Sequence, residues 1–421
     1  MGKSVLKERG KMEKKRWLIL AASCLVTLCI GSLYAWSVFA SPMAEYLTEL
    51  TGKEIVSLAI VFTVANAVGP ITMISGGFIN DRLGPKLVLI IGGILFGAGM
   101  IGSGFAKSVP MLIVTYGLGV GLGVGMVYGT IVSNAVKFFP DKRGFAGGLT
   151  TACYGGSSII IPIIATMLLK NHHITSAFKI IGLVMMIIIV ASAFVIEKCP
   201  DNFTVSGTGS AKAANAKQNA PAKKQYRYDE MLKTQEFYLM LVILTCGAFA
   251  GMMIISQASS ISQRMMGMTA QKAAAIVSVI ALFNMLGRLA SGSLSDKLGP
   301  INTMRITFAG SLISGILLFA CHEGSAALYY LGLAVAGFCF GSIMGIYPGF
   351  TASQFGSKNN SVNYGIMFIG FALAGLFGPM IMNSIYNSSG RYQPAFLVAA
   401  ALAVVGEVLI VFLDRRLKAA A

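Results

Sequence analysis

The chain alternates between long apolar runs and short breaks that hold charged residues, glycine or proline. A helix needs about 20 apolar residues to cross a hydrocarbon core of about 30 Å. The pattern predicts twelve membrane-spanning helices, which we place at residues 17–40, 55–79, 87–106, 109–136, 144–169, 175–196, 237–258, 271–295, 303–321, 326–355, 362–386 and 394–413. We therefore expect an all-α membrane protein that is embedded in a lipid bilayer.

A polar segment at residues 199–227 separates the first six predicted spans from the last six. The segment is rich in small and basic residues, so it cannot bury a core of its own. Residues 228–238 have the character of a short amphipathic helix that lies at the membrane surface. We expect an N-terminal six-helix half at residues 1–197, a cytoplasmic linker with an interfacial helix at 198–236, and a C-terminal six-helix half at 237–421.

A short motif occurs twice, once in each predicted half, at a constant offset of 215 residues. The matching pairs are Gly77 with Gly292, Asp81 with Asp296, and Gly84 with Gly299. A repeat of this length indicates two pseudo-symmetric halves of six helices each.

Both copies of the motif end a predicted span and place an aspartate beside a tight turn. Asp81 at its helix end can pair with Arg82, with Lys86 or with neighbouring helix termini, and so hold one face of the protein shut. Asp296 and Lys297 take the same part in the second copy. A solvated charge cluster is the alternative, but the repetition favours a gate.

Composition excludes a soluble globule, because 55% of the residues are hydrophobic and only 12% are charged. The net charge of +17 would suggest a nucleic-acid partner in a soluble protein, but here its distribution is the informative property. Of the 33 Lys and Arg residues, 25 fall on the side of the N-terminus and seven on the other side. The positive-inside rule then predicts that both termini lie in the cytoplasm. We expect a multi-pass protein of the cell's inner (plasma) membrane with no nucleic-acid partner.

Motifs of enzyme chemistry are not found in the sequence. It has no His-Glu-x-x-His and no Gly-x-Ser-x-Gly, and it has only three histidines. Its seven cysteines fall mostly within predicted spans and imply no disulfide framework. We expect no enzyme activity, no cofactor and no metal.

The strongest functional candidate is Arg288, which lies eight residues inside the predicted span that ends near Asp296. Eight helical residues correspond to about 12 Å of depth. A guanidinium at that depth costs about 2.5–3.5 kcal/mol on insertion scales, so it normally faces a water-filled cavity or a partner. Asn284 lies one turn earlier on the same face. This helix is expected to line a cavity and to present a donor fork to an anion.

Two aromatic residues and one acid each allow two interpretations. Tyr34 can place its hydroxyl in a central cavity or belong to an outer aromatic belt. Tyr128 follows a stripe of glycines and can cap the same cavity or simply pack. Glu407 lies seven residues from Asp414, about 10 Å inside its span, where it can carry a proton. The alternative for Glu407 is an acid on an outer helix that is protonated or snorkels.

The paired motifs resemble the loop signature G-x-L-x-D-R-x-G-x-[KR] of the major facilitator superfamily. Beyond that, the chain resembles the oxalate/formate antiporter family, which is close to the monocarboxylate transporters. The residues that carry this resemblance are Tyr34-Ala-Trp36, Val127-Tyr128-Gly129, Phe139-Pro-Asp-Lys-Arg-Gly144, Glu230-Met-Leu-Lys-Thr, Arg288 with Ser295-Asp-Lys-Leu-Gly299, and Asn363-Tyr364-Gly365. The resemblance implies that Arg288 binds a substrate carboxylate and that Tyr34, Tyr128 and Tyr154 are aromatic residues of the substrate site.

Three positions depart from these relatives. The oxalate exchanger has a lysine eight residues after the Asn of Asn-Tyr-Gly, and this chain has Phe371. One cation in the cavity suits a monoanion better than a dianion. Animal-type monocarboxylate carriers have an aspartate one turn before the arginine and a lysine in the first span, and here those positions are Asn284 and Val38. The proton-coupling carboxylate of those carriers therefore has no counterpart.

The sequence thus predicts a monomeric transporter that moves a small monocarboxylate such as lactate, pyruvate or formate by alternating access, with a proton as a candidate co-substrate. Phe340 and Phe371 are expected to exclude water from the site. Two alternatives remain, an oxalate/formate-type exchanger and a carboxylate-binding membrane sensor that does not transport.

Overall fold

The computed structural model describes residues 3–55, 57–200, 203–205, 224–322 and 324–419. Every element in this part of the chain is a helix. The first group is α1 (Lys3–Ile30), η1 (Gly31–Ala35), α2 (Trp36–Thr51), α3 (Ala59–Leu83), α4 (Pro85–Ser103), α5 (Val109–Leu112), η2 (Ile113–Val120), α6 (Gly121–Phe138), α7 (Arg143–Asn171) and α8 (Ile174–Ser192). The second group is α10 (Tyr228–Met231), α11 (Gln235–Met266), α12 (Ala270–Leu298), α13 (Pro300–Phe319), α14 (Ala326–Phe355), α15 (Asn360–Met367), α16 (Ile369–Ser389) and α17 (Gln393–Ala419).

These helices form twelve segments that are long and apolar enough to cross a membrane. The predicted number of spans is confirmed, although several helices continue past the apolar run. The first segment, for example, extends over Met12–Thr51 instead of the predicted 17–40. Its polar ends remain helical because a helix satisfies its own backbone hydrogen bonds in water as well as in lipid.

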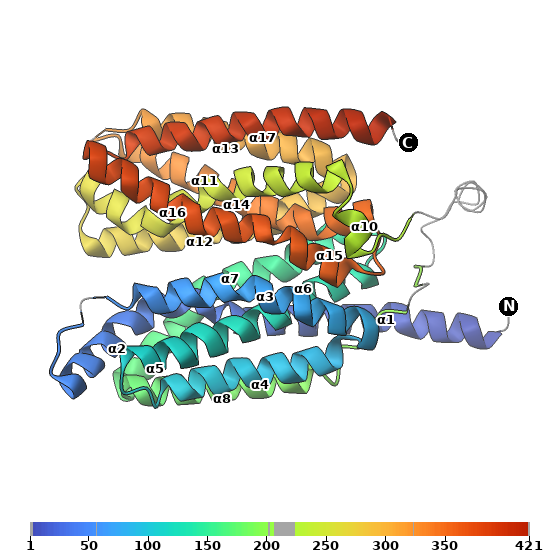
Figure 1. Cartoon of the computed structure of the whole chain (residues 1–421), viewed down its shortest axis with the longest axis horizontal. Coiled ribbons are helices and arrows are strands. Elements are labelled where there is room, and N and C mark those ends of the chain that lie inside the picture. The colour runs from blue at the N-terminus through green and yellow to red at the C-terminus, as the bar shows by residue number, and fades with distance from the viewer. Residues whose placement is uncertain (1–2, 56, 201–202, 206–223, 323, 420–421) are drawn as a thin grey trace.

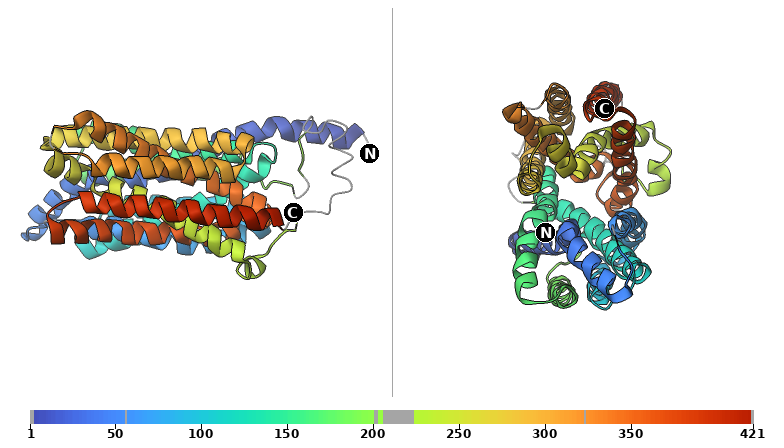
Figure 2. Two further views of the ribbon diagram at one scale, coloured as in Figure 1. Left: turned by 90° about the horizontal axis from the view of Figure 1, so that it is seen from above. Right: turned by 90° about the vertical axis from the view of Figure 1, so that its left-hand side faces the viewer.

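The two groups of helices occupy different parts of the molecule. Helices α1 to α8, the N-terminal half, lie together in the lower part of Figure 1, and α11 to α17, the C-terminal half, lie above them. The right-hand view of Figure 2, which looks along the helix axes, shows the same division. Both termini lie at one end of the bundle, which we call the terminal face (Figure 1).

The interfacial helix predicted for residues 228–238 is shorter than expected. It is helix α10, which has only four residues and is followed by a turn. Helix α11 then begins at Gln235, where the side chain of Thr234 accepts a hydrogen bond from the amide of Phe237. A threonine at this position caps a helix start, which separates α10 from α11. The domain boundaries at 197/198 and 236/237 stay a prediction.

Close backbone contacts hold α12 at the centre of the molecule. Gly148 of α7 packs on the backbone of Arg288, and Gly144 of α7 packs on Gly292 of α12. A Cβ added to Gly148 or to Gly292 would collide with the backbone of the other helix. On the other side, Gly345 of α14 also touches the backbone of Arg288. Small residues let helices approach in this way. Helix α12 is therefore clamped between α7 of one half and α14 of the other, which puts Arg288 at the interface of the two halves.

Candidate functional site

A cavity of about 50 Å³ lies beside Arg288, between the two halves. Since one water needs roughly 10–15 Å³ by the same measure, the space holds about four waters or a small molecule of similar size. Helices from both halves line it. The predicted site residues on its wall are Tyr34, Tyr128, Tyr154, Arg288 and Phe371.

Arg288 is buried, with 2% of its surface exposed. Its Nε donates a hydrogen bond to Oδ1 of Asn284 at 2.7 Å, and Nη1 donates to the carbonyl of Thr151 at 3.2 Å. These bonds use two of the five N–H donors of the guanidinium. In the described part of the chain, no carboxylate forms an ion pair with Arg288. The result is a fixed cation that borders a cavity and has donors to spare.

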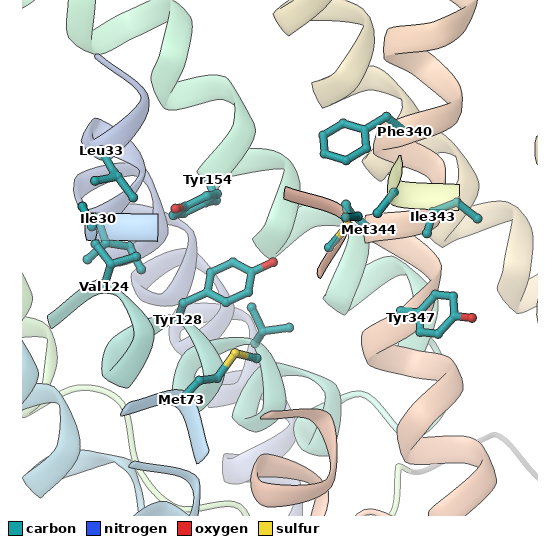
Figure 3. Close-up of a cluster of buried hydrophobic side chains, with 14 of the residues drawn as sticks. Ile30, Leu33, Met73, Val124, Tyr128, Tyr154, Phe340, Ile343, Met344 and Tyr347 are labelled. Carbon is teal, nitrogen blue, oxygen red and sulfur yellow. The ribbon is translucent and has the colours of Figure 1, made fainter. Parts of the chain in front are cut away.

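Three tyrosines surround this cation from different elements. The rings of Tyr34 and Tyr154 meet edge to face at 5.3 Å, and those of Tyr128 and Tyr154 lie 4.9 Å apart. Figure 3 shows Tyr128 directed toward Met344 and thus toward the C-terminal half. All three tyrosines therefore line the same cavity as Arg288.

The position of Tyr34 depends on a local break in the first span. Residues Gly31–Ala35 form a 3₁₀ turn between α1 and α2. Gly31 lies against Tyr154 and Ser157 of α7 with no room for a Cβ. This contact brings the turn close to α7 and sets Tyr34 beside Tyr154. The outer-belt alternative for Tyr34 is thereby excluded, since the residue lines the cavity.

Asn284 and Phe340 differ in position from the other predicted residues. Asn284 orients the guanidinium by its bond to Nε and is not part of the cavity wall. Phe340 lies behind the wall, where its ring stacks on Phe371 at 6.3 Å. Phe371 in turn stacks on Phe368 at 4.6 Å. Phe340 therefore supports the aromatic wall from behind and does not itself face the cavity.

Sequence reasoning missed several wall residues, chiefly Asn66, Met73, Met344 and Phe368. Asn66 is a polar residue in an apolar run, and the wall residues Pro70 and Met73 follow it by four and seven positions. This periodicity could have revealed a cavity face on α3. The amide of Asn66 donates to the carbonyl of Phe62 at 2.9 Å, which leaves its Oδ1 as an acceptor.

The two repeated aspartates make equivalent contacts near the terminal face. Asp296 accepts hydrogen bonds from the amides of Gly144 and Phe145, both at 2.7 Å, at the start of α7. Asp81 accepts from the amides of Ser361 and Val362, at 3.3 and 3.1 Å, at the start of α15. Each carboxylate thus binds the positive end of a helix from the opposite half. We call these contacts the two latches.

The cations of the repeated motif do not take part in the latches. Lys137 of α6 forms the ion pair with Asp81, at 2.7 Å. The backbone carbonyl of Arg82 accepts a hydrogen bond from Nζ of Lys198, while Nζ of Lys86 lies 4.5 Å from the ring centroid of Phe194. Lys297 is exposed. Of the partners that the sequence allowed for Asp81, the structure therefore selects helix termini over Arg82 and Lys86.

Buried polar contacts surround the first latch. Asn80 donates to the hydroxyl of Ser361 at 2.7 Å, and Ser361 donates to Ser133 at 3.0 Å. Asn360 also donates to Ser133, at 3.0 Å. These bonds join α3 and α6 to α15 across the interface. Together with the latches, they hold the two halves in contact near the terminal face.

Glu407 lies away from the cavity. It is on α17, with 40% of its side chain exposed, and its Oε1 is 3.7 Å from Nε of Arg305 on α13. Figure 1 shows α17 at the outer edge of the C-terminal half. The structure therefore supports the outer-helix interpretation of Glu407 and does not place it at a central proton site.

Comparisons with known proteins agree with this architecture. Residues 23–379 match the model of the Major Facilitator Superfamily. The chain is 30% identical to the oxalate:formate antiporter of Oxalobacter formigenes, an alignment that covers 96% of this chain and 92% of that protein. It is 22% identical to monocarboxylate transporter 13 of Rattus norvegicus, over 94% and 88% of the two chains. The crystal structure of the transporter FucP in the outward conformation matches with a TM-score of 0.71 at 16% identity, over 95% of this chain and 99% of that one. The chain therefore belongs to the Major Facilitator Superfamily and is a multi-pass membrane transporter, not an enzyme.

Proposed function

We propose that this transporter carries small monocarboxylates, of the lactate, pyruvate or formate type, across the cell's inner (plasma) membrane by alternating access. The observation that carries the proposal is the buried guanidinium of Arg288 with no carboxylate beside it. In the described part of the chain, the cavity wall has one positive charge and no negative charge. A monoanion neutralises this charge, whereas a dianion would bring an uncompensated negative charge into a medium of low dielectric constant.

The geometry of the wall supports recognition of a carboxylate. An arginine fork can bind both oxygens of a carboxylate with charge-assisted hydrogen bonds. Asn284 holds Nε, so the fork is oriented before substrate arrives. The tyrosine hydroxyls and the Oδ1 of Asn66 are then available to the rest of the molecule. A cavity of about 50 Å³ restricts the substrate to a few heavy atoms.

The latches support a mechanism in which the two halves rock about the site. Asp81 and Asp296 each bind the other half near the terminal face, and these contacts support a conformation in which this face is closed. Opening it requires both latches to break. The excess of Lys and Arg on the side of the termini supports a cytoplasmic location for this face.

Proton coupling has no carboxylate carrier in the described cavity wall. Glu407 contacts Arg305 on the periphery. A proton that accompanies the substrate would therefore travel on the acid itself. Because one chain supplies the whole wall, we propose a monomer as the transport unit.

The second candidate is exchange of oxalate for formate, which the relationship to the oxalate:formate antiporter supports. Phe371 stands against it, since that position holds a lysine in the exchanger that the chain resembles. A carboxylate sensor without transport is the third possibility.

Uptake into proteoliposomes separates these candidates. Labelled lactate, formate and oxalate are offered to vesicles that are empty, loaded with unlabelled anion, or subject to a pH gradient. We expect saturable uptake of lactate or formate and little uptake of oxalate. Rapid oxalate counterflow would instead identify an exchanger, and binding without accumulation would identify a sensor.

A further inference from the structure

A second cavity, of about 410 Å³, lies between the two halves near the terminal face. Its wall includes Lys137, Arg143, Lys198 and Lys358, with Asp81 as the one carboxylate in the described part of the chain. We propose that this cavity, which we call the basic cavity, binds a small multivalent anion such as inorganic phosphate at a site separate from the transport site.

The first support is an excess of three positive charges on the wall. Asp81 does not offset more than one of the four cations, because it is already bound by Lys137 and by two amides of α15. Clefts lined by one sign of charge concentrate counter-ions. A multivalent anion therefore matches the basic cavity, whereas the cavity at Arg288 matches a monoanion.

The second support is the state of Arg143, the first residue of α7. Its Nη1 donates to the carbonyl of Ala352 at 3.4 Å, which is at the long limit of a hydrogen bond. Its Nε is buried and has no hydrogen-bond partner in the described chain. A guanidinium with unused donors suits the oxygens of a phosphate or carboxylate group.

The third support is that both halves contribute to the wall. Lys137 and Arg143 belong to the N-terminal half, and Lys358 belongs to the C-terminal half. Nζ of Lys137 also donates to the backbone carbonyl of Lys358 at 3.2 Å, so these two residues are in contact across the interface. A bound anion would bridge the halves next to the Asp81 latch. It would stabilise the closed terminal face and slow transport, an effect that rests on the proposed function.

Calorimetric titration of the purified protein with inorganic phosphate, at ionic strength held constant with chloride, tests the site. Lys358→Gln is the informative variant, because the bonds of Lys358 within the fold come from its backbone and its side chain is exposed. We expect Lys358→Gln and Arg143→Gln to weaken phosphate binding about tenfold, the effect of losing one charge-assisted contact. Lys233→Gln removes an exposed charge near the same face, outside the cavity wall, and should leave binding unchanged.

Arg288→Lys separates the two sites. Phosphate binding should survive this variant if the basic cavity is the site. Loss of binding in Arg288→Lys, equal binding by wild type and Lys358→Gln, or no binding at all would each overturn the proposal. If the protein transports no monocarboxylate but phosphate binding still depends on Lys358, the proposed function fails and the site stands.

The headgroup of an anionic phospholipid has the same chemistry as free phosphate. The titration is therefore repeated in nanodiscs of phosphatidylcholine with and without phosphatidylglycerol. Competition by phosphatidylglycerol that depends on Lys358 assigns the site to the headgroup as well, and lack of competition assigns it to the soluble anion. In transport, phosphate at the terminal face should lower the maximal rate of uptake without raising KM, while a rise in KM alone would place phosphate at Arg288 and contradict the proposal.

Discussion

The guanidinium of Arg288 donates a hydrogen bond to the carbonyl of Thr151, 3.2 Å away on helix α7 of the opposite half. The guanidinium that we propose to bind the anion thus also forms one of the hydrogen bonds that join the two halves. A carboxylate that binds Arg288 would use the remaining donors of the same guanidinium. Because one group contacts both the substrate and the opposite half, substrate binding can shift the equilibrium between open and closed interfaces directly.

Replacement of Arg288 by lysine should lower monocarboxylate uptake at least tenfold. Lysine keeps the charge but not the planar fork, so at least one charge-assisted bond, worth about 1.5–3 kcal/mol, is lost. Uptake of labelled substrate into proteoliposomes measures the effect. Arg391→Lys, at an exposed loop position, is the matched control and should transport normally. Wild-type rates in Arg288→Lys would remove Arg288 from the site.

Asn284→Asp should abolish anion binding more completely than Asn284→Ala. The aspartate would lie within hydrogen-bond distance of Nε and pair with it, so the net charge of the site would fall from one to zero. The alanine variant loses the orienting bond but keeps the charge. We expect at least a tenfold larger rise in Kd for the aspartate variant, measured by calorimetry. Equal affinities in the two variants would show that the charge of the site does not govern binding.

Removal of a latch carboxylate should open the terminal face. Asp296→Ala leaves the amides of Gly144 and Phe145 without their acceptor and removes about 1.5–3 kcal/mol from the closed state, which corresponds to roughly a tenfold or larger population shift. A cysteine at the buried Ser133, in a background without the seven native cysteines, reports the opening by faster reaction with a maleimide. Unchanged labelling in Asp296→Ala would argue against a latch.

The ion pair of Arg16 and Asp141 should matter for stability more than for transport. Both side chains are more than 90% buried, Nη1 lies 2.7 Å from Oδ1, and the guanidinium stacks on Phe139. Breaking a buried pair leaves an uncompensated charge and costs about 3–5 kcal/mol, whereas replacing both partners with apolar residues costs much less. We expect Arg16→Met alone to lower Tm clearly, and Arg16→Met with Asp141→Leu to recover most of the loss. Additive losses in the double variant would contradict this account.

Glu407→Gln should leave uptake and its dependence on a pH gradient unchanged. Glu407 is on the outer helix α17, bound to Arg305 and distant from the cavity wall. The comparison of uptake with and without the gradient is the measurement. A specific loss of the gradient-driven component would restore Glu407 as a proton carrier.

The sequence predicts the fold well, because twelve apolar runs and one repeated motif leave little freedom in a bilayer. Arg288 was predictable for the same reason, since a charge inside a span needs an explanation. The wall around it was harder to predict. Phe368, the single residue between α15 and α16, lines the cavity together with Phe371. Phe340 stacks on Phe371 and is not part of the wall. Helical periodicity gives the face of a residue but not the order of rings in a stack.

The lone positive charge beside the cavity also affects the half of the cycle in which no cargo is bound. A loaded carrier brings an electrically neutral pair through the occluded state, while an empty one must bring a bare guanidinium through it. The empty carrier should therefore return slowly, and its return should respond to voltage, at about 2.3 kcal/mol per charge for each 100 mV that it crosses. Such a protein would therefore exchange one acid for another across the membrane faster than it would release an acid and return empty.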